Sequence, residues 1–360
     1  MKQFLLLIFA ILLGFSIQAQ PYYASTTPEN KTVILEEFTG VRCGSCPSGH
    51  QKIHDLLTEF PTQLIALAYS PENSGLTFPY SGDENLTRTY LNAFYTSSYL
   101  GERFMPGGVI NRRVWDGSNR IQSRSAWESK ATIIMGESSP VNVGLHSIYD
   151  AVNNQLIVDV EVYFTADMGG AKLFVHLLED SIQVNKQAGS SVSPYTLFHV
   201  FRENLNTAQW GDPITGPTTQ GSLYTTQYVF DLENAIGDID VNQAHIVAFV
   251  NDDATGENLS GKMTDVNSPL ANRPPASIDD AQISPNPVIS DLYVRFTAKD
   301  EESEMTIFNL LGQPMYTTTI YGKGYQQLAF DKNSLNVKHG LYLLKITSGN
   351  QSYTGKVVFE

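Results

Sequence analysis

Two cysteines separated by two residues are the side chains of this sequence with the clearest chemistry. Cys43 and Cys46 enclose Gly44 and Ser45, and Pro47 follows them. At the N-terminus of a helix, free backbone N–H groups and the helix dipole stabilise a thiolate, which lowers the pKa of the first cysteine. The second cysteine, one turn further on, can attack a mixed disulfide and release its partner. We therefore predict Cys43 as the nucleophile of a thiol–disulfide exchange and Cys46 as the resolving thiol.

The segments on either side of the two cysteines fit this role. Residues 31–38 hold a short apolar run that predicts a buried strand, and the apolar residues of 53–60 recur at helical spacing. A strand that leads through the two cysteines into an amphipathic helix is far more specific than an isolated pair of cysteines. Glu36 and Glu37 are neighbours on the strand and point to opposite faces, so they do not form a paired acid–base site.

Strand and helix patterns continue to alternate over residues 30–138. Strands are predicted at 64–69 and 108–112, and a helix around Trp127, Ala131 and Ile134. Residues 81–84 have the pattern of a capping box, which predicts a further helix that carries Leu86, Tyr90 and Phe94 on one face. Residues 71–82 form an insertion. The alternation predicts an α/β domain.

The rest of the chain is rich in strand patterns. Residues 139–267 contain alternating apolar runs, such as 156–164, and predict an antiparallel β-sandwich that we expect to be immunoglobulin-like. Residues 268–280 hold three prolines without periodicity and predict a linker. Residues 281–360 predict a small β-sandwich. The expected fold class is a multidomain α+β protein.

Composition narrows the function further. The chain has 360 residues, with 23 Lys and Arg against 37 Asp and Glu, and a net charge of −14. Such acidity argues against nucleic acid as a partner, because phosphate binding relies on clustered basic residues. Two cysteines exclude a disulfide framework and an iron–sulfur cluster held by this chain alone. No cofactor is implied.

The N-terminus predicts export. Residues 1–19 combine a basic start, an apolar run from Phe4 to Phe15 and a small residue at the expected cleavage site, as in a secretory signal peptide. No later segment is apolar enough over about 18 residues to span a membrane, so we expect no transmembrane segment in the mature chain. The two cysteines are then expected in an oxidising compartment.

Three other interpretations of the cysteine pair remain open. A pair of this spacing in an exported protein can be a permanent structural disulfide. Together with His50 and His54, which lie four residues apart on the predicted helix, it could also bind a metal ion. Thr39 ahead of Cys43 would suit a thiol peroxidase, although the proline expected upstream is missing.

Residues 33–47 resemble the active-site strand and helix of the thioredoxin superfamily. The resemblance implies that Glu37, six residues before Cys43, is a buried acid that assists proton transfer to the resolving cysteine. It also implies that residues 104–112 hold a cis-proline, Pro106, opposite the disulfide. This sequence departs from the family pattern at Arg42, where a tryptophan is common, and in the Gly-Ser pair between the cysteines. The predicted catalytic residues are Cys43, Cys46, Glu37 and Pro106, with no metal or cofactor ligands.

Two further resemblances concern the protein's location. The stretches EEFTGVRCGSCP, MPGGVINR and HVFRENLN…WGDPI resemble the outer-membrane-protein-28-related family over about residues 30–265. Four elements of residues 281–360, including ISPNP and the terminal KVVF, resemble a type A sorting domain of type IX secretion. This implies export through the periplasm to the cell surface, the outer membrane or the extracellular space, with the secretion machinery as partner.

Together these features predict an exported thioredoxin-like protein that exchanges disulfides with protein thiols or disulfides. The alternative is a non-enzymatic surface protein, for binding or structure, with an inert disulfide.

Overall fold

The computed structural model divides into two compact units, residues 1–271 and 272–360. It describes residues 23–266 except 152, and residues 281–359 except 285, 289, 290 and 350. The predicted signal peptide (1–19) and linker (268–280) lie outside the described residues. Within the described residues, no helix has the length and apolar character needed to cross a membrane.

The first unit contains helices and most of the strands. Its α-helices are α1 (Cys46–Glu59), α2 (Ser97–Leu100) and α3 (Trp127–Met135), with 3₁₀ helices η1 (Thr89–Ala93), η2 (Arg124–Ala126) and η3 (Leu232–Asn234). Its strands are β1 (Val33–Phe38), β2 (Leu64–Tyr69), β3 (Gly107–Ile110), β4 (Ile121–Gln122), β5 (Val141–Asp150), β6 (Gln155–Phe164), β7 (Ala171–Glu179), β8 (Ile182–Val184), β9 (Tyr195–Leu197), β10 (Val200–Asn204), β11 (Asp212–Pro213), β12 (Leu223–Asp231), β13 (Ala244–Asp252) and β14 (Asn258–Asp265).

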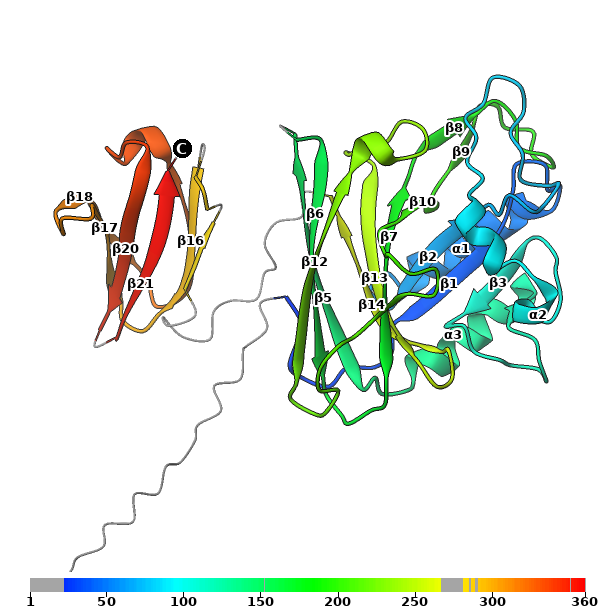
Figure 1. Ribbon diagram of the computed structural model, residues 1–360, viewed down its shortest axis with the longest axis horizontal. Helices are drawn as coiled ribbons and strands as arrows, with labels where there is room; N and C mark the ends of the chain where they lie inside the picture. The colour runs from blue at the N-terminus through cyan, green and yellow to red at the C-terminus, as the bar shows by residue number, and fades with distance from the viewer. Residues whose placement is uncertain are drawn as a thin grey trace, which may run out of the picture. The chain divides into compact units, whose positions relative to one another are not determined.

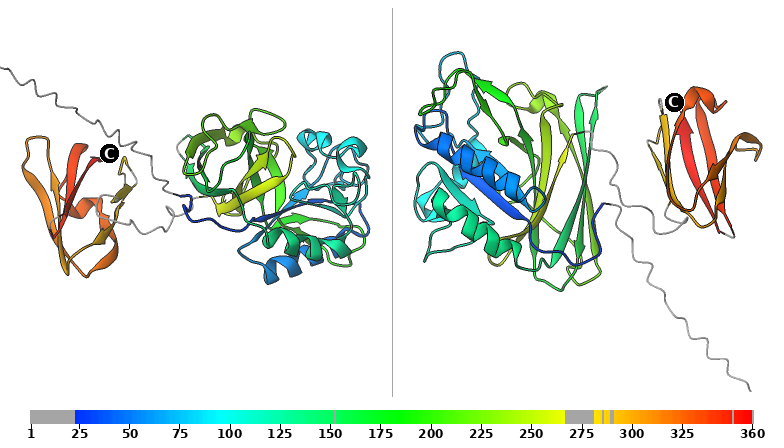
Figure 2. Two further views of the ribbon diagram at one scale, coloured as in Figure 1. Left: turned by 90° about the horizontal axis from the view of Figure 1, so that it is seen from below. Right: turned by 180° about the vertical axis from the view of Figure 1, so that it is seen from behind.

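One long sheet organises the first unit (Figure 1). Its strands run in the order β14-β13-β7-β10-β2-β1-β3-β4, and β11 pairs with β7. In its second half, β1 and β2 are parallel, β3 is antiparallel to β1, and β4 is antiparallel to β3. Helices α1 and α3 cover the same face of this half (Figure 2), where Val33 and Leu35 pack against Ile53, Leu56 and Trp127.

The other half of the long sheet forms one layer of a β-sandwich. The facing layer is a three-stranded sheet in the order β12-β6-β5. Alternate residues of β6, including Val158, Val160 and Val162, are buried in the core between the layers. The alternating pattern of residues 156–164 therefore predicted the buried face correctly, because successive residues of a strand point to opposite faces.

The two halves are joined by hydrogen bonds of the backbone. Strand β10 pairs with β7 on one side and, through Val200 opposite Ala68, with β2 on the other. The backbone N–H of Ala68 also donates to the carbonyl of His199 at 2.8 Å. The boundary expected between residues 138 and 139 therefore lies within one compact unit, and the two segments share a sheet.

The helix predicted after residues 81–84 does not form. Residues 85–88 are extended, and only the 3₁₀ helix η1 and the single-turn α2 follow. Leu86 packs in a small cluster with Val41 and Val200, whereas Phe94 belongs to the core around Phe38. Because the two side chains enter different cores, they cannot lie on one helical face.

The second unit is a small β-sandwich, as its strand patterns predicted. It contains β15 (Gln282–Ser284), β16 (Asp291–Ala298), β17 (Glu302–Phe308), β18 (Pro314–Tyr321), β19 (Gly324–Asp331), the 3₁₀ helix η5 (Lys332–Ser334), β20 (Gly340–Ser348) and β21 (Gln351–Phe359). A three-stranded sheet, β15-β16-β19, packs on a four-stranded sheet, β18-β17-β20-β21. The core includes Phe296, Ile307 and Phe359.

Candidate functional site

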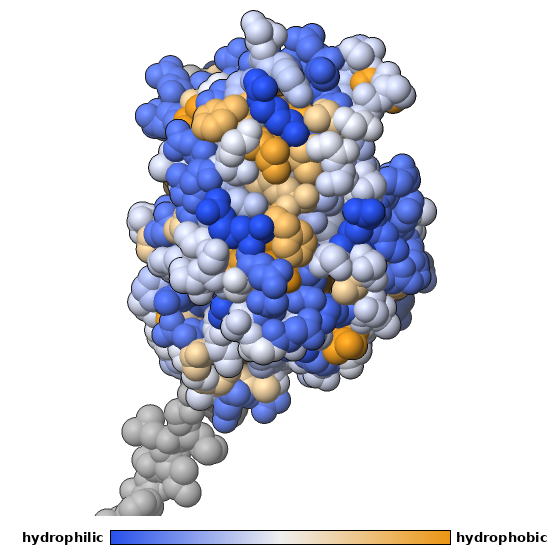
Figure 3. All heavy atoms as spheres, turned by 90° about the vertical axis from the view of Figure 1, so that its right-hand side faces the viewer, coloured by the Kyte–Doolittle hydropathy of each residue, from blue (hydrophilic) through white to orange (hydrophobic). Residues whose placement is uncertain are grey.

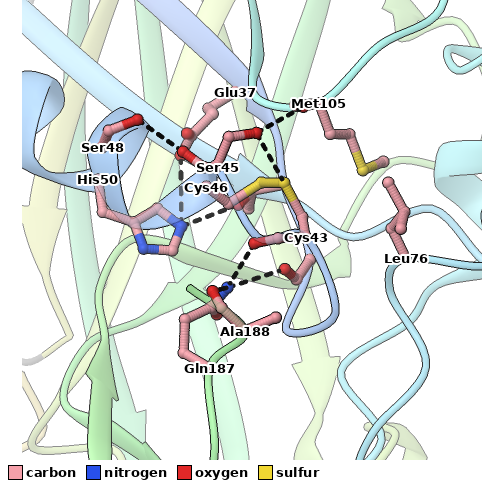
Figure 4. Close-up of a disulfide and its surroundings, with 12 residues drawn as sticks. Glu37, Cys43, Ser45, Cys46, Ser48, His50, Leu76, Met105, Gln187 and Ala188 are labelled. Atoms are coloured by element: carbon pink, nitrogen blue, oxygen red, sulfur yellow. Dashed lines mark hydrogen bonds and ion pairs between the residues drawn. A yellow bond between two sulfur atoms is a disulfide. The ribbon is translucent and has the colours of Figure 1, made fainter. Parts of the chain in front are cut away.

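The candidate site is built around a disulfide between Cys43 and Cys46. Strand β1 ends at Phe38, and a short loop leads to α1, which begins at Cys46. Pro47 occupies the first turn of α1, where its missing N–H would have no partner in any case. The predicted strand, cysteine pair and helix therefore form as expected, with the disulfide at the N-terminus of the helix (Figure 4).

Glu37 reaches the site from β1. Its side chain is on the face that α1 covers, and it is completely buried with no hydrogen-bond partner for either carboxylate oxygen. Burial raises the pKa of Glu37 well above its ordinary value, because an ionised carboxylate loses its hydration there. Figure 4 shows the Glu37 carboxyl on the Cys46 side of the disulfide.

A glycine of α1 lets the helix approach Glu37 closely. A methyl group at Gly49 would lie 2.3 Å from Oε1 of Glu37 and 2.8 Å from Cβ of Pro106. The Met105–Pro106 bond is cis, as the resemblance implied. Ser45 Oγ donates to the Met105 carbonyl at 3.4 Å. The structure thus brings Cys43, Cys46, Glu37 and Pro106 together, and their chemical roles remain predictions.

His50 connects Glu37 to two hydroxyl groups. Its Nε2 lies 2.8 Å from Oγ1 of Thr39 and 3.9 Å from Oε2 of Glu37, and its Nδ1 lies 2.9 Å from the hydroxyl of Tyr195. Burial lowers the pKa of His50 to about 4, so the imidazole is neutral at neutral pH. Burial and the nearby Glu37 raise the pKa of Tyr195. Sequence reasoning did not identify Tyr195, which comes from β9.

The metal interpretation gains no support from this arrangement. Both ring nitrogens of His50 already have hydroxyl partners, and His54 is exposed on α1. Within the part of the chain that the structure describes, no group of three or more His, Cys, Asp or Glu residues could hold a metal ion.

Glu36 serves a different purpose on the opposite face of β1. It accepts hydrogen bonds from both Nε and Nη2 of Arg112, the shortest at 2.7 Å, and from the hydroxyl of Tyr69 at 3.0 Å. The guanidinium of Arg112 also lies 4.1 Å from the ring centroid of Phe174. The expectation that Glu36 and Glu37 point to opposite faces of the strand is confirmed.

Two loops cover the disulfide, and we call them the cover loops: residues 74–79 and residues 187–190. With these loops in place, Cys43 is 2% exposed and Cys46 is fully buried. From the first loop, the carbonyl of Leu76 accepts the backbone N–H of Arg42 at 2.9 Å. The first loop belongs to the insertion predicted at residues 71–82.

The second cover loop donates hydrogen bonds to backbone carbonyls of the cysteine loop. Nε2 of Gln187 donates to the carbonyls of Gly40 (3.2 Å) and Cys43 (3.1 Å), and the N–H of Ala188 donates to the carbonyl of Val41 at 2.8 Å. No sequence motif marked this loop, because it lies more than 140 residues after the cysteines.

Arg42 anchors the first cover loop. Its Nε donates to the carbonyl of Phe78 at 2.9 Å, its Nη2 donates to that of Pro79 at 2.8 Å, and its guanidinium lies 4.4 Å from the Tyr80 ring centroid. Leu76 and Phe78 are 41% and 44% exposed, which leaves an apolar rim beside the cysteines. Arg42 therefore has a structural role here.

Two parts of the chain match known protein families. Residues 93–267 match the family model of outer membrane protein Omp28, and residues 282–360 match that of the secretion system C-terminal sorting domain. No curated protein matches the chain significantly. The chain therefore carries a region that matches the Omp28 family, followed by a type IX secretion sorting domain, and it is exported to the cell surface or outer membrane. The sorting domain implies interaction with the type IX secretion machinery. The Omp28 match begins after the disulfide.

A solved structure from Porphyromonas gingivalis shows a related fold. HBP35 of Porphyromonas gingivalis is 17% identical, with a TM-score of 0.55 over 92% of this chain and 98% of its own. Protein AGR_C_4864 of Agrobacterium tumefaciens is 13% identical, with a TM-score of 0.40 over 67% and 97%. A domain of the outer membrane lipoprotein Omp28 of P. gingivalis is 20% identical, with a TM-score of 0.26 over 36% and 89%.

Proposed function

We propose that this exported protein exchanges disulfides with protein thiols through Cys43 and Cys46, on a thioredoxin-like domain over residues 30–138. An immunoglobulin-like sandwich over residues 139–267 extends its sheet. The strand order β2-β1-β3-β4, with α1 after β1 and α3 after β4, supports this assignment. The observation that carries the proposal is the meeting of a disulfide at a helix N-terminus with an unpartnered buried acid, which lies with Pro106 against Gly49.

The exchange follows from ordinary thiol chemistry. A thiolate of a partner protein attacks Sγ of Cys43, the Cys43–Cys46 bond breaks, and Cys46 leaves as a thiolate that takes up a proton. A second partner thiolate then attacks the partner's sulfur in the mixed disulfide and displaces Cys43. The partner ends with a disulfide, and the two cysteines of this chain end as thiols. The same steps in reverse reduce a partner disulfide.

Glu37 is suited to move the proton in these steps. Because burial raises its pKa, the carboxyl holds a proton that it can give to the Cys46 thiolate. In the reverse direction, it can accept that proton again. A neutral carboxyl also avoids placing a negative charge beside the thiolate that forms. His50 and Tyr195 complete the polar surroundings of Glu37 without adding a charge at neutral pH.

The burial of Cys43 favours the alternative, in which the disulfide is structural. At 2% exposure, Cys43 cannot meet a partner thiolate while the cover loops are in place. The exchange function therefore requires the cover loops to open, whereas a structural disulfide needs no opening.

The reduction potential separates the two functions. The purified protein is equilibrated with glutathione buffers, and the oxidised fraction of Cys43–Cys46 is measured. We expect a potential in the exchange range, roughly −270 to −120 mV, whereas a structural disulfide has a value below about −300 mV. A value below that limit would support the structural alternative.

Substitution of Glu37 gives a second, kinetic test. Glu37→Gln keeps the shape of the side chain and removes the transferable proton. We expect slower exchange with a thiol substrate and an unchanged fold by circular dichroism. The exposed Glu59→Gln on α1 is the matched control and is expected to react at the wild-type rate. Equal rates for both variants would contradict the assigned role.

A further inference from the structure

The first unit contains a cavity that begins at Glu37 and His50 and extends beyond the cysteine site. It lies between α1, β2, β9 and the segment of residues 77–86, and its volume is about 640 Å³. That size is within the usual range for small-molecule sites. Much of its wall is apolar and includes Val41, Ile53, Leu57, Leu86, Leu197 and Val200. Figure 3 shows apolar side chains gathered in a hollow on the side of this unit that carries the helices.

The buried polar atoms of the cavity wall that lack a hydrogen-bond partner are all oxygens. Four buried oxygens that lack a hydrogen-bond partner belong to residues of its wall: Oε1 and Oε2 of Glu37, Oδ2 of Asp83 and Oε1 of Gln187. Among the described residues, none of the unpartnered buried nitrogens belongs to the wall. An unpartnered buried acceptor is unfavourable, and a guest that donates a hydrogen bond to it removes this cost.

The charge of the wall points in the same direction. Glu37, Asp83 and Glu84 supply carboxyl groups, and the described wall contains neither lysine nor arginine. Arg202, which lies outside the wall, pairs with Glu84. The whole chain is acidic as well, with a net charge of −14, so its field attracts cations. The wall also carries imidazole, amide and hydroxyl groups, but the carboxylates of Asp83 and Glu84 repel an anionic guest.

We propose that this cavity binds an alkylammonium group, whose apolar chain packs on the walls and whose N–H groups donate to an unpartnered wall oxygen, Oδ2 of Asp83. A small organic amine or a lysine side chain of a polypeptide would both supply this chemistry. The proposal does not depend on exchange through Cys43 and Cys46, and it stands or falls separately from it.

Binding of octylammonium to the full-length exported chain tests the proposal by calorimetry. Two molecules with the same chain, 1-octanol and octanoate, separate the head group from the tail. We expect saturable binding of octylammonium at one site, at least tenfold weaker binding of 1-octanol, and no binding of octanoate. Equal affinities for octylammonium and 1-octanol, or no binding of octylammonium, would overturn the proposal.

A pair of matched variants locates the site. In the wild type, Oδ1 of Asp83 accepts the backbone N–H of Asn185 at 2.7 Å. Asp83→Asn removes the charge of the carboxylate and keeps an oxygen for this hydrogen bond. Asp167→Asn is the control, because Oδ1 of Asp167 accepts the N–H of Gln220 at 2.8 Å away from the cavity. We expect at least a fivefold loss of octylammonium affinity in Asp83→Asn and no change in the control. Equal affinities in both variants would place the binding elsewhere.

Two further measurements complete the test. Leu57→Trp fills part of the cavity and is expected to abolish binding while thermal unfolding stays cooperative; unchanged affinity in a folded variant would contradict the site. The peptide acetyl-Gly-Lys-Gly-amide is then added to the octylammonium complex. If the peptide displaces octylammonium, the cavity accepts the alkylammonium group of a lysine side chain. If octylammonium stays bound, the ligand of the cavity is a small free amine.

Discussion

Gly189 gives the sharpest test of whether the cover loops control access to the disulfide. Its φ is +78°, and a methyl group there would lie 1.9 Å from the carbonyl oxygen of Gly44. A residue with a Cβ costs about 1–2 kcal/mol in the left-handed region. The overlap with a backbone oxygen adds to this, because no side-chain rotation can relieve it. Gly189→Ala therefore destabilises the closed position of the second cover loop.

The expected effect is a faster reaction of the disulfide. If reduction requires a prior opening of the loops, a loss of about 1–2 kcal/mol raises the open population roughly 5–30-fold. The reduction rate rises by the same factor. The assay follows reduction by excess dithiothreitol, with samples quenched by a maleimide and the two labelled cysteines counted by mass.

Gly117→Ala is the matched control for backbone strain. Gly117 also has a positive φ, +68°, but no atom lies within 4 Å of the position of its added Cβ. We expect the control to be reduced at the wild-type rate. Equal rates in Gly189→Ala and the wild type would refute the reasoning, because the loops would then not limit access to Cys43.

Three further predictions concern other parts of the chain. In single Cys→Ser variants, we expect Cys43 in Cys46→Ser to form a mixed disulfide at neutral pH faster than Cys46 in Cys43→Ser, and equal or reversed rates would contradict the assignment. The pKa of His50 falls from 6.5 in the unfolded chain to about 4 on folding, so its contribution to stability is complete above 6.5 and is lost as the pH falls toward 4. Between pH 6.5 and 4, the free energy of unfolding of the wild type should therefore fall by on the order of 3 kcal/mol more than that of His50→Gln. His54→Gln, on the exposed side of α1, should show the same pH dependence as the wild type. Replacement of residues 356–360 should leave the chain in the periplasm with its sorting domain uncleaved, as seen by cell fractionation, and normal surface display would show that these residues are not needed for export.

The cysteine site was predictable because its signals are local. The apolar run of β1, the cysteine spacing and the periodicity of α1 lie within 27 residues, Val33–Glu59. The position of Pro106 followed from the resemblance alone. What joins Pro106 to Glu37 is Gly49, a residue without functional groups, whose absent side chain allows the close approach.

The errors and omissions come from long-range contacts. The helix predicted through Leu86 and Phe94 fails because the two residues belong to different cores, which their spacing does not reveal. The shared sheet depends on Val200 opposite Ala68, 132 positions apart, and no local pattern encodes such a pairing.

The cover loops and the redox chemistry are coupled through the charge of the thiolate. A disulfide is uncharged and is buried at little electrostatic cost, whereas a thiolate at Cys43 would lose its hydration beneath the same loops. The closed loops therefore stabilise the oxidised state, which is the state that the structure holds. By linkage, any interaction that opens the loops, such as a polypeptide bound at the exposed Leu76 and Phe78, also makes the disulfide easier to reduce. The burial of Cys43 is then compatible with exchange, provided that the partner itself supplies the binding energy that opens its path to the sulfur.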